Sequence, residues 1–228
     1  FHETHPMKSF EVITKLPHQL DADIYDKVNS YLLDLHVNQL HALLFHSFSS
    51  YKENFENFNV LTELKANGKI KYIGVSVYTN EEIEEVLLND DVDLIQLPFN
   101  LFDNSNSRGE ILERARAKGK IVHTRSALLQ GLFFKDIDSN NNTVKSLKKE
   151  LFQLANIAKK SNVTTVGLAL NYCLQQNTIN NVLIGVDSKK QLEDNLTVVN
   201  YRIDANTINE INQIKVKNPD LLNPSLWD

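Results

Sequence analysis

The stretch KYIGVS at residues 71–76 decides the fold, because it is a short apolar run that ends in a polar residue, Ser76. A strand buried on both faces of a parallel sheet has this nearly continuous apolar pattern. Strands that alternate with helices indicate βαβ units. The same pattern recurs at residues 11–15, 41–46, 93–96, 120–125 and 181–185. Helical patterns are predicted at 21–35, 54–67, 105–118, 143–161, 164–176, 187–196 and 206–214, and residues 79–82 open a further helix.

Several helix boundaries carry their own signals. Thr79 followed by Glu82 predicts a capping box, in which each residue satisfies a backbone N–H group of the other. Gly68 and Gly119 follow helical segments and predict their ends.

Two architectures place helices against a parallel sheet: the doubly wound open sheet and the β/α barrel. A dinucleotide-binding open sheet needs a G-x-G-x-x-G turn, which this sequence lacks. The barrel uses the loops after its last two strands for phosphate, here residues 126–131 and 185–190. The second loop combines a glycine, a predicted helix start and two lysines, which together favour anion binding. We therefore expect residues 1–228 to form a single β/α-barrel domain, an α/β fold of the TIM-barrel (β/α)8 type.

Composition excludes several classes of function. The net charge is -5 and no basic stripe is present, which argues against nucleic acid as a partner. No segment is apolar and long enough to suggest a membrane partner, and residues 1–6 do not resemble a signal peptide. The single cysteine, Cys173, fits a reducing compartment, so we expect a cytoplasmic protein.

Polar residues at the carboxyl ends of the predicted strands form the first functional hypothesis, because chemistry in parallel barrels collects at that end. A lysine and a histidine there are candidates for acid–base work, although a strand-end lysine also occurs simply to reach solvent. These end residues are Lys15, His46, Ser76, Gln96, Arg125 and Gly185.

Four segments in order resemble the aldo-keto reductase family. They are GKIKYIGVS at 68–76, LIQLPFN at 94–100, RSALLQG at 125–131 and the segment 185–195. The third resembles a bacterial branch of the family. The resemblance implies an eight-stranded barrel that passes hydride between NAD(P)H and a carbonyl carbon. It also implies a tyrosine that protonates the carbonyl oxygen, assisted by a lysine, a histidine and an aspartate.

Within this resemblance, Lys15 and His46 take catalytic roles. A lysine ammonium group lowers the pKa of a nearby phenol, and a neutral imidazole can orient a carbonyl oxygen. The spacing of His36, His41 and His46 fits no zinc pair, so no metal site is expected.

The remaining matched positions imply cofactor binding. Ser76 and Gln96 would hold the nicotinamide carboxamide, although Val77 replaces an asparagine that is frequent in the family. Arg125 stands where many members carry a stacking aromatic ring. NADP is the expected cofactor, because Lys189 or Lys190 can serve a 2′-phosphate. NAD is the alternative, because Gln191 stands where many NADPH-specific members of the family have an arginine. The expected cofactor contacts beyond the strands are Ser126, Leu128, Gln130, Gly185, Ser188, Lys189, Gln191 and Asn195.

One part of the family pattern has no counterpart. The tyrosine and aspartate belong to an Asp-x-Ala-x-x-Tyr-Gly context, and none of the seven tyrosines lies in one. Residues 1–8 resemble the end of the helix before the third barrel strand. The visible strands thus match strands three to eight, and roughly fifty to sixty residues of the first two β/α units are expected to precede them.

We therefore expect NAD(P)H-dependent reduction of an aldehyde, ketone or sugar. The alternatives are a catalytically inactive family member that serves as a binding or regulatory protein, and a barrel aldolase or isomerase that uses Lys15 as a Schiff-base lysine. Residues 47–54 and 133–142, expected as substrate loops, carry no specificity signal, and the sequence predicts no oligomeric state.

Overall fold

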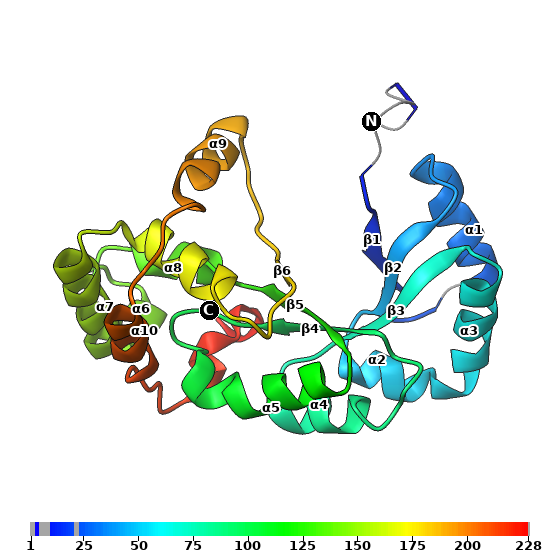
Figure 1. Ribbon diagram of the computed structural model, residues 1–228, viewed down its shortest axis with the longest axis horizontal. Helices are drawn as coiled ribbons and strands as arrows, with labels where there is room; N and C mark the ends of the chain where they lie inside the picture. The colour runs from blue at the N-terminus through cyan, green and yellow to red at the C-terminus, as the bar shows by residue number, and fades with distance from the viewer. Residues whose placement is uncertain (1–2, 5–9, 21–22, 228) are drawn as a thin grey trace. The chain divides into compact units, whose positions relative to one another are not determined.

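The computed structural model describes residues 3–4, 10–20 and 23–227, in two compact units. The first unit contains the residues up to Leu97 together with Ala115–Ile121. The second contains Pro98–Arg114 and the residues from Val122 onward. Figure 1 shows strands and helices alternating along the chain, as the sequence predicts.

Parallel strands form the sheet of the first unit, in the order in which they occur along the chain. Lys15 pairs with Leu44, and Ser76 pairs with Gln96, so the polar strand ends lie at the same edge of the sheet. These strands are β1 (Ile13–Lys15), β2 (Leu40–Phe45), β3 (Ile70–Ser76) and β4 (Leu94–Pro98).

Aliphatic side chains hold these strands together. Ala42, Leu44 and Leu94 are fully buried in one cluster, and Ile13 and Tyr72 pack against it. Burial of one leucine side chain contributes roughly 1.5–3 kcal/mol. The apolar runs that predicted the strands therefore also form the core that fixes the positions of their polar ends.

Helices flank the strands of the first unit (Figure 1). Thr79 and Glu82 form the predicted capping box, and Gly68 has a φ of 70° just after a helix, which suits glycine because it lacks a Cβ. The elements are α1 (Ile24–Asp34), α2 (Phe48–Glu53), the 3-10 helix η1 (Phe55–Asn57), α3 (Phe58–Ala66) and α4 (Asn80–Val86).

The second unit is mostly helical and contains one pair of parallel strands, in which His123 is in register with Asn181. Its elements are α5 (Ser105–Ala117, which ends in the first unit), β5 (Ile121–Arg125), η2 (Leu129–Phe134), α6 (Asn142–Ser146), α7 (Lys148–Ser161), α8 (Thr165–Leu174), β6 (Asn181–Val182), α9 (Lys189–Val198), α10 (Ala205–Asn212), η3 (Pro219–Leu222) and η4 (Pro224–Leu226).

Aromatic and polar contacts fix the interior of the second unit. Phe99 and Tyr172 stack with ring centroids 5.5 Å apart. Asn104 Nδ2 donates to the backbone carbonyls of Ile211 and Ile214 at 3.1 and 3.0 Å, which ties the end of α10 to the start of α5. A buried amide with satisfied hydrogen bonds of this kind specifies one arrangement of its neighbours.

The structure corrects several predicted boundaries. The expected helix over 54–67 starts earlier and is broken: Ser47 accepts a hydrogen bond from Ser50 N–H and caps α2 inside a stretch that was expected to be a loop. The helix expected over 143–161 breaks at Leu147. The strand expected over 181–185 is only two residues long, although Leu183 N–H still bonds to Thr124.

Two other expectations lie outside the described residues. The segment 1–8, compared above with the end of a helix, is described only at Glu3 and Thr4. The expected helix start at Asp21 is not described either, and α1 is capped by Asp23. Among the described residues, no helix combines the length and apolar character needed to cross a membrane.

Candidate active site and cofactor pocket

Lys15 and Ser76 meet at the carboxyl edge of the first unit's sheet. Lys15 Nζ donates a hydrogen bond to Ser76 Oγ at 3.0 Å. Lys15 ends β1 and Ser76 ends β3, and both strands pair with β2. The Ser76 side chain is buried, with 1% of the residue exposed. A hydroxyl that accepts from an ammonium group keeps its own proton available to donate to another acceptor.

Gln96 lies beside Ser76 in the next strand. The two residues are register partners, and Val77 N–H donates to the Gln96 backbone carbonyl at 2.9 Å. Gln96 is 3% exposed and Val77 is fully buried. The structure thus brings two of the expected carboxamide-binding side chains to neighbouring strand ends.

His46 follows β2 and stacks on a second histidine. The rings of His18 and His46 lie 5.3 Å apart between centroids, with 24° between their planes. The sequence did not point to His18, because it lies in the irregular segment after β1, where no periodic pattern marks a residue. His46 is exposed, so its ring is accessible at this edge of the sheet.

One phenol contacts Lys15, but through the backbone. The Tyr31 hydroxyl donates to the Lys15 backbone carbonyl at 3.1 Å. This contact connects α1 to the end of β1. Within the described part of the chain, no group of three or more histidine, cysteine, aspartate or glutamate side chains is placed to hold a metal ion.

The second unit contains a pocket of about 720 Å³ between the loop after β5 and the start of α9. Its walls combine leucine, isoleucine and valine side chains with hydroxyl and amide groups. Six of the predicted cofactor residues line it, namely Ser126, Leu128, Gln130, Gly185, Gln191 and Asn195. Arg125 and Ser188 are next to lining residues in the chain, and Lys189 lies two positions from both Asp187 and Gln191; these three residues do not line the pocket themselves.

The loop after β5 has an unusual backbone. Ser126, Leu129 and Gln130 have φ values of 62°, 45° and 48°, and Gly131 follows at 75°. The left-handed region costs most residues other than glycine about 1 kcal/mol or more, and such strain is concentrated at functional sites. The fully buried Leu129 side chain anchors this conformation. The sequence revealed only the glycine.

Two reciprocal hydrogen bonds shape the start of α9. Ser188 Oγ accepts from Gln191 N–H at 3.2 Å, and Gln191 Oε1 accepts from Asp187 N–H at 2.7 Å. Gly185 is open, since no atom lies within 4 Å of the position of an added Cβ. Gln191 and Asn195 line the same pocket, as their spacing of four residues predicts.

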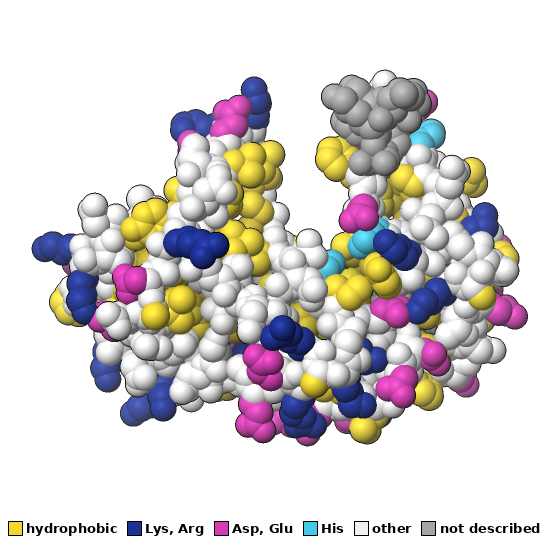
Figure 2. All heavy atoms as spheres, viewed as in Figure 1, with side chains coloured by type: hydrophobic (Ala, Val, Ile, Leu, Met, Phe, Trp, Pro, Cys, Tyr) yellow, Lys and Arg dark blue, Asp and Glu magenta, His cyan; other side chains and the backbone are white. Residues whose placement is uncertain are grey.

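The two lysines of α9 are engaged with acidic side chains. Lys189 pairs with Glu193 at 3.3 Å, and Lys190 pairs with Asp194 at 2.8 Å. The sequence suggested an anion site from a glycine, a helix start and the two lysines, and that prediction did not count these carboxylates. Figure 2 shows charged side chains of both signs at the tip of this helix and hydrophobic side chains along it.

Sequence reasoning gave no individual role to several other residues of the pocket. Phe134 and Val166 belong to segments without a motif, and Asp187 and Asp194 lie between residues that were recognised. The helical spacing of Gln191, Asp194 and Asn195 was the signal that could have identified Asp194.

Comparison with known proteins shows which family the chain resembles. The profile of the Aldo/keto reductase family matches residues 3–216. The NADH-specific methylglyoxal reductase of Escherichia coli is 26% identical over 162 residues, which are 65% of this chain and 49% of that protein. The chain thus spans about half the length of this curated relative.

Solved structures show the same fold. The holo form of the aldo-keto reductase AKR11C1 from Bacillus halodurans superposes with a TM-score of 0.75 at 18% identity, over 90% of this chain and 72% of that one. The apo form of Gox0644 gives 0.70 at 23% identity, over 95% and 74%. With the profile match over nearly its whole length, the chain belongs to the aldo/keto reductase family.

Proposed function

We propose that this protein reduces a carbonyl compound with NADH or NADPH. In this proposal Lys15 and His46 act on the carbonyl oxygen, and Ser76 and Gln96 bind the nicotinamide carboxamide. The observation that carries the proposal is the 3.0 Å hydrogen bond from Lys15 Nζ to Ser76 Oγ. It joins the proposed catalytic lysine to a proposed cofactor ligand at one edge of the sheet.

The residues of the second unit suit the adenine end of a dinucleotide. Leu128, Phe134 and Ile184 offer apolar surface to a base, while Gln130 and Asn195 offer amide hydrogen-bonding groups. Ligand pockets usually combine these two kinds of lining. Asn195 is 8% exposed, so its amide is well shielded from competing water.

When bound, the nicotinamide would supply a hydride that reduces the carbonyl carbon to an alcohol carbon, while the oxygen would take its proton from an acid, which the family resemblance implies is a tyrosine. Lys15 places a positive charge where negative charge develops on that oxygen, which stabilises the transition state. His46 donates an N–H hydrogen bond that orients the oxygen. The buried Ser76 and Gln96 present polar groups in fixed positions, so little reorganisation is needed during reaction.

The proposed substrate is a small aldehyde or ketone. The name of the Escherichia coli relative, a methylglyoxal reductase, supports testing a small dicarbonyl first. The resemblance of residues 125–131 to a bacterial branch of the family keeps sugars in the test panel.

Cofactor binding and turnover test this function separately. Quenching of protein fluorescence measures NADH and NADPH binding, and loss of reduced-cofactor absorbance measures turnover with methylglyoxal, simple aldehydes, ketones and aldoses. Both signals are expected from the folded full-length protein. Binding without turnover on any carbonyl would contradict the proposal and favour a binding or regulatory role. Borohydride trapping of a substrate on Lys15 would instead favour an aldolase-type reaction.

A further inference from the structure

Carboxylates supply the charge of the pocket in the second unit. Among the described residues that line it, Asp187 and Asp194 are the charged ones. Asp187 is exposed just before the start of α9, and the Asp194 side chain, seven residues later, is 62% exposed.

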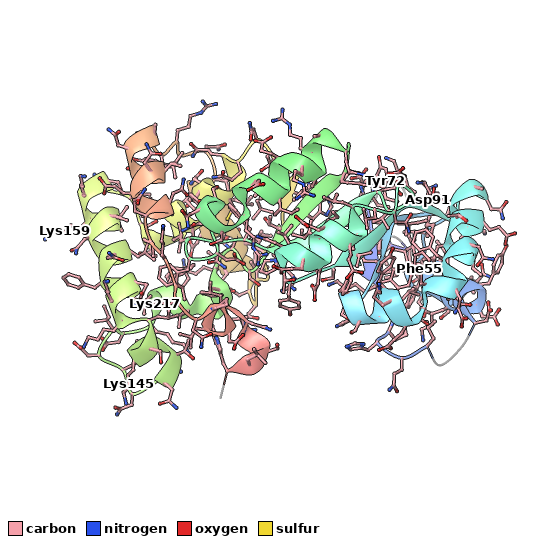
Figure 3. All side chains as sticks on the ribbon, turned by 90° about the horizontal axis from the view of Figure 1, so that it is seen from below. Phe55, Tyr72, Asp91, Lys145, Lys159 and Lys217 are labelled. Atoms are coloured by element: carbon pink, nitrogen blue, oxygen red, sulfur yellow. The ribbon has the colours of Figure 1, made fainter. Side chains whose placement is uncertain are left out.

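The two lysines at the start of α9 are balanced by acidic partners. Lys190 Nζ contacts both carboxylate oxygens of Asp194, at 3.0 and 2.8 Å. Lys189 pairs with Glu193 in the same i,i+4 geometry. Lys145 and Lys159 of this unit project outward from α6 and α7 (Figure 3), and neither lines the pocket.

The side-chain amide of Gln191 is also engaged in a hydrogen bond. Gln191 Oε1 accepts from Asp187 N–H at 2.7 Å, which holds the side chain against the start of the helix. This bond uses an N–H group that would otherwise be available to an anion at the helix start. The segment 185–195 therefore presents three carboxylates and two lysines, with both lysines paired.

NADP differs from NAD by a phosphate on the adenosine ribose, which replaces a hydroxyl group. A carboxylate accepts a hydrogen bond from the hydroxyl but repels the phosphate, whereas an unpaired cation favours the phosphate. We propose that this pocket selects NADH over NADPH, and that Asp194 determines the choice by lining the pocket and by engaging Lys190. The inference rests on the proposed function and replaces the sequence expectation of NADP.

Equilibrium binding of the two reduced cofactors to the full-length protein tests this selection. NADH is expected to bind about tenfold or more tightly than NADPH. The ratio is expected to fall as salt is raised, because ions screen the repulsion between exposed charges. Equal or tighter binding of NADPH would overturn the inference and leave the proposed function standing. If neither cofactor binds to the folded protein, both fail.

Two variants of α9 distinguish an effect specific to Asp194 from the effect of removing any negative charge from this helix. Asp194→Asn removes the carboxylate and releases Lys190, so NADPH affinity is expected to rise about tenfold while NADH affinity changes less than about threefold. Glu193→Gln removes the same charge one residue away and releases Lys189, but Glu193 does not line the pocket. A gain in NADPH affinity as large in Glu193→Gln as in Asp194→Asn would overturn the role of Asp194.

Discussion

The strand ends of the first unit and the loops around the pocket of the second unit position their residues by different means. Ser76 and Gln96 are fixed by sheet register and burial, and Lys15 is held against Ser76. The pocket is built from left-handed backbone at residues 126–131 and from the capping bonds of α9. We infer that the first region serves chemistry, which needs fixed geometry, and that the second serves binding.

The largest expected effect is on turnover, and it comes from the strand ends. Lys15→Met removes the charge that stabilises the developing alkoxide, so turnover is expected to fall about 10²–10⁴-fold. Cofactor affinity is expected to change less than about threefold, because Lys15 does not line the pocket and its contact with a proposed cofactor ligand is a single hydrogen bond to Ser76. Steady-state kinetics and fluorescence titration measure the two quantities.

Lys71→Met provides the matched control for that variant. Lys71 is exposed near the amino end of β3, the strand that carries Ser76 at its other end. The Lys71→Met variant should turn over substrate as fast as the wild-type protein. Similar losses in both variants would show that charge in general, and not the strand-end lysine, supports activity.

The next largest expected effect is on the stability of the protein, and it comes from the buried side chain of Lys120. Lys120 Nζ donates to the backbone carbonyls of Asn89, Asp90 and Val92 at 3.0, 3.2 and 2.6 Å. Burial lowers the pKa of Lys120, but these three acceptors stabilise the charged form. Lys120→Met leaves them without this donor and should lower the free energy of unfolding by about 2 kcal/mol in urea denaturation. Lys118→Met, at an exposed neighbouring lysine, should leave the midpoint almost unchanged.

A smaller effect involves Tyr172 in the second unit. Its hydroxyl accepts from Ser105 N–H at 2.9 Å and donates to Asn212 Oδ1. Tyr172→Phe removes these bonds and should cost about 1 kcal/mol, measured by thermal unfolding at neutral pH.

Tyr172 should also make the free energy of unfolding depend on pH in the alkaline range. Burial raises the pKa of Tyr172 to about 12, whereas an unfolded tyrosine titrates near pH 10. Its contribution is therefore complete below pH 10 and is lost as the pH rises towards about 12, because the unfolded chain releases the proton first. Tyr172→Phe should lack this component; an identical alkaline loss in both proteins would assign it to other groups.

The smallest expected effect is on cofactor affinity, and it tests the cap at the start of α9. Ser188→Ala removes the bond to Gln191 N–H, and loss of such a cap costs a helix about 1 kcal/mol. NADH affinity should fall a few-fold while the midpoint of global unfolding stays nearly constant. Ser188→Thr keeps a capping hydroxyl and should restore affinity. A loss that Thr does not rescue would mean that Ser188 acts in some way other than as a cap.

The sequence predicted the strand ends of the first unit better than the loops. Apolar runs with polar ends predicted the strands, and parallel register then placed Ser76 beside Gln96 and brought Lys15 within reach. His18 was not predictable, because its stacking on His46 depends on the path of an irregular loop. The paired state of Lys190 was open to prediction, since Asp194 lies four residues later, but the prediction of an anion site considered the lysines without their acidic neighbours. The left-handed backbone at Leu129 has no signal in its side chain, because only tertiary burial stabilises it.

Transfer of deuterium from NADH that carries deuterium at both hydrogen positions of the nicotinamide C4 tests the central claim most directly. With methylglyoxal or another carbonyl that the full-length protein turns over, the alcohol product should carry one deuterium at the former carbonyl carbon, as measured by mass spectrometry. The label should appear at a strongly reduced rate in Lys15→Met. An alcohol product without deuterium, or label transfer that is equally fast without Lys15, would contradict the account.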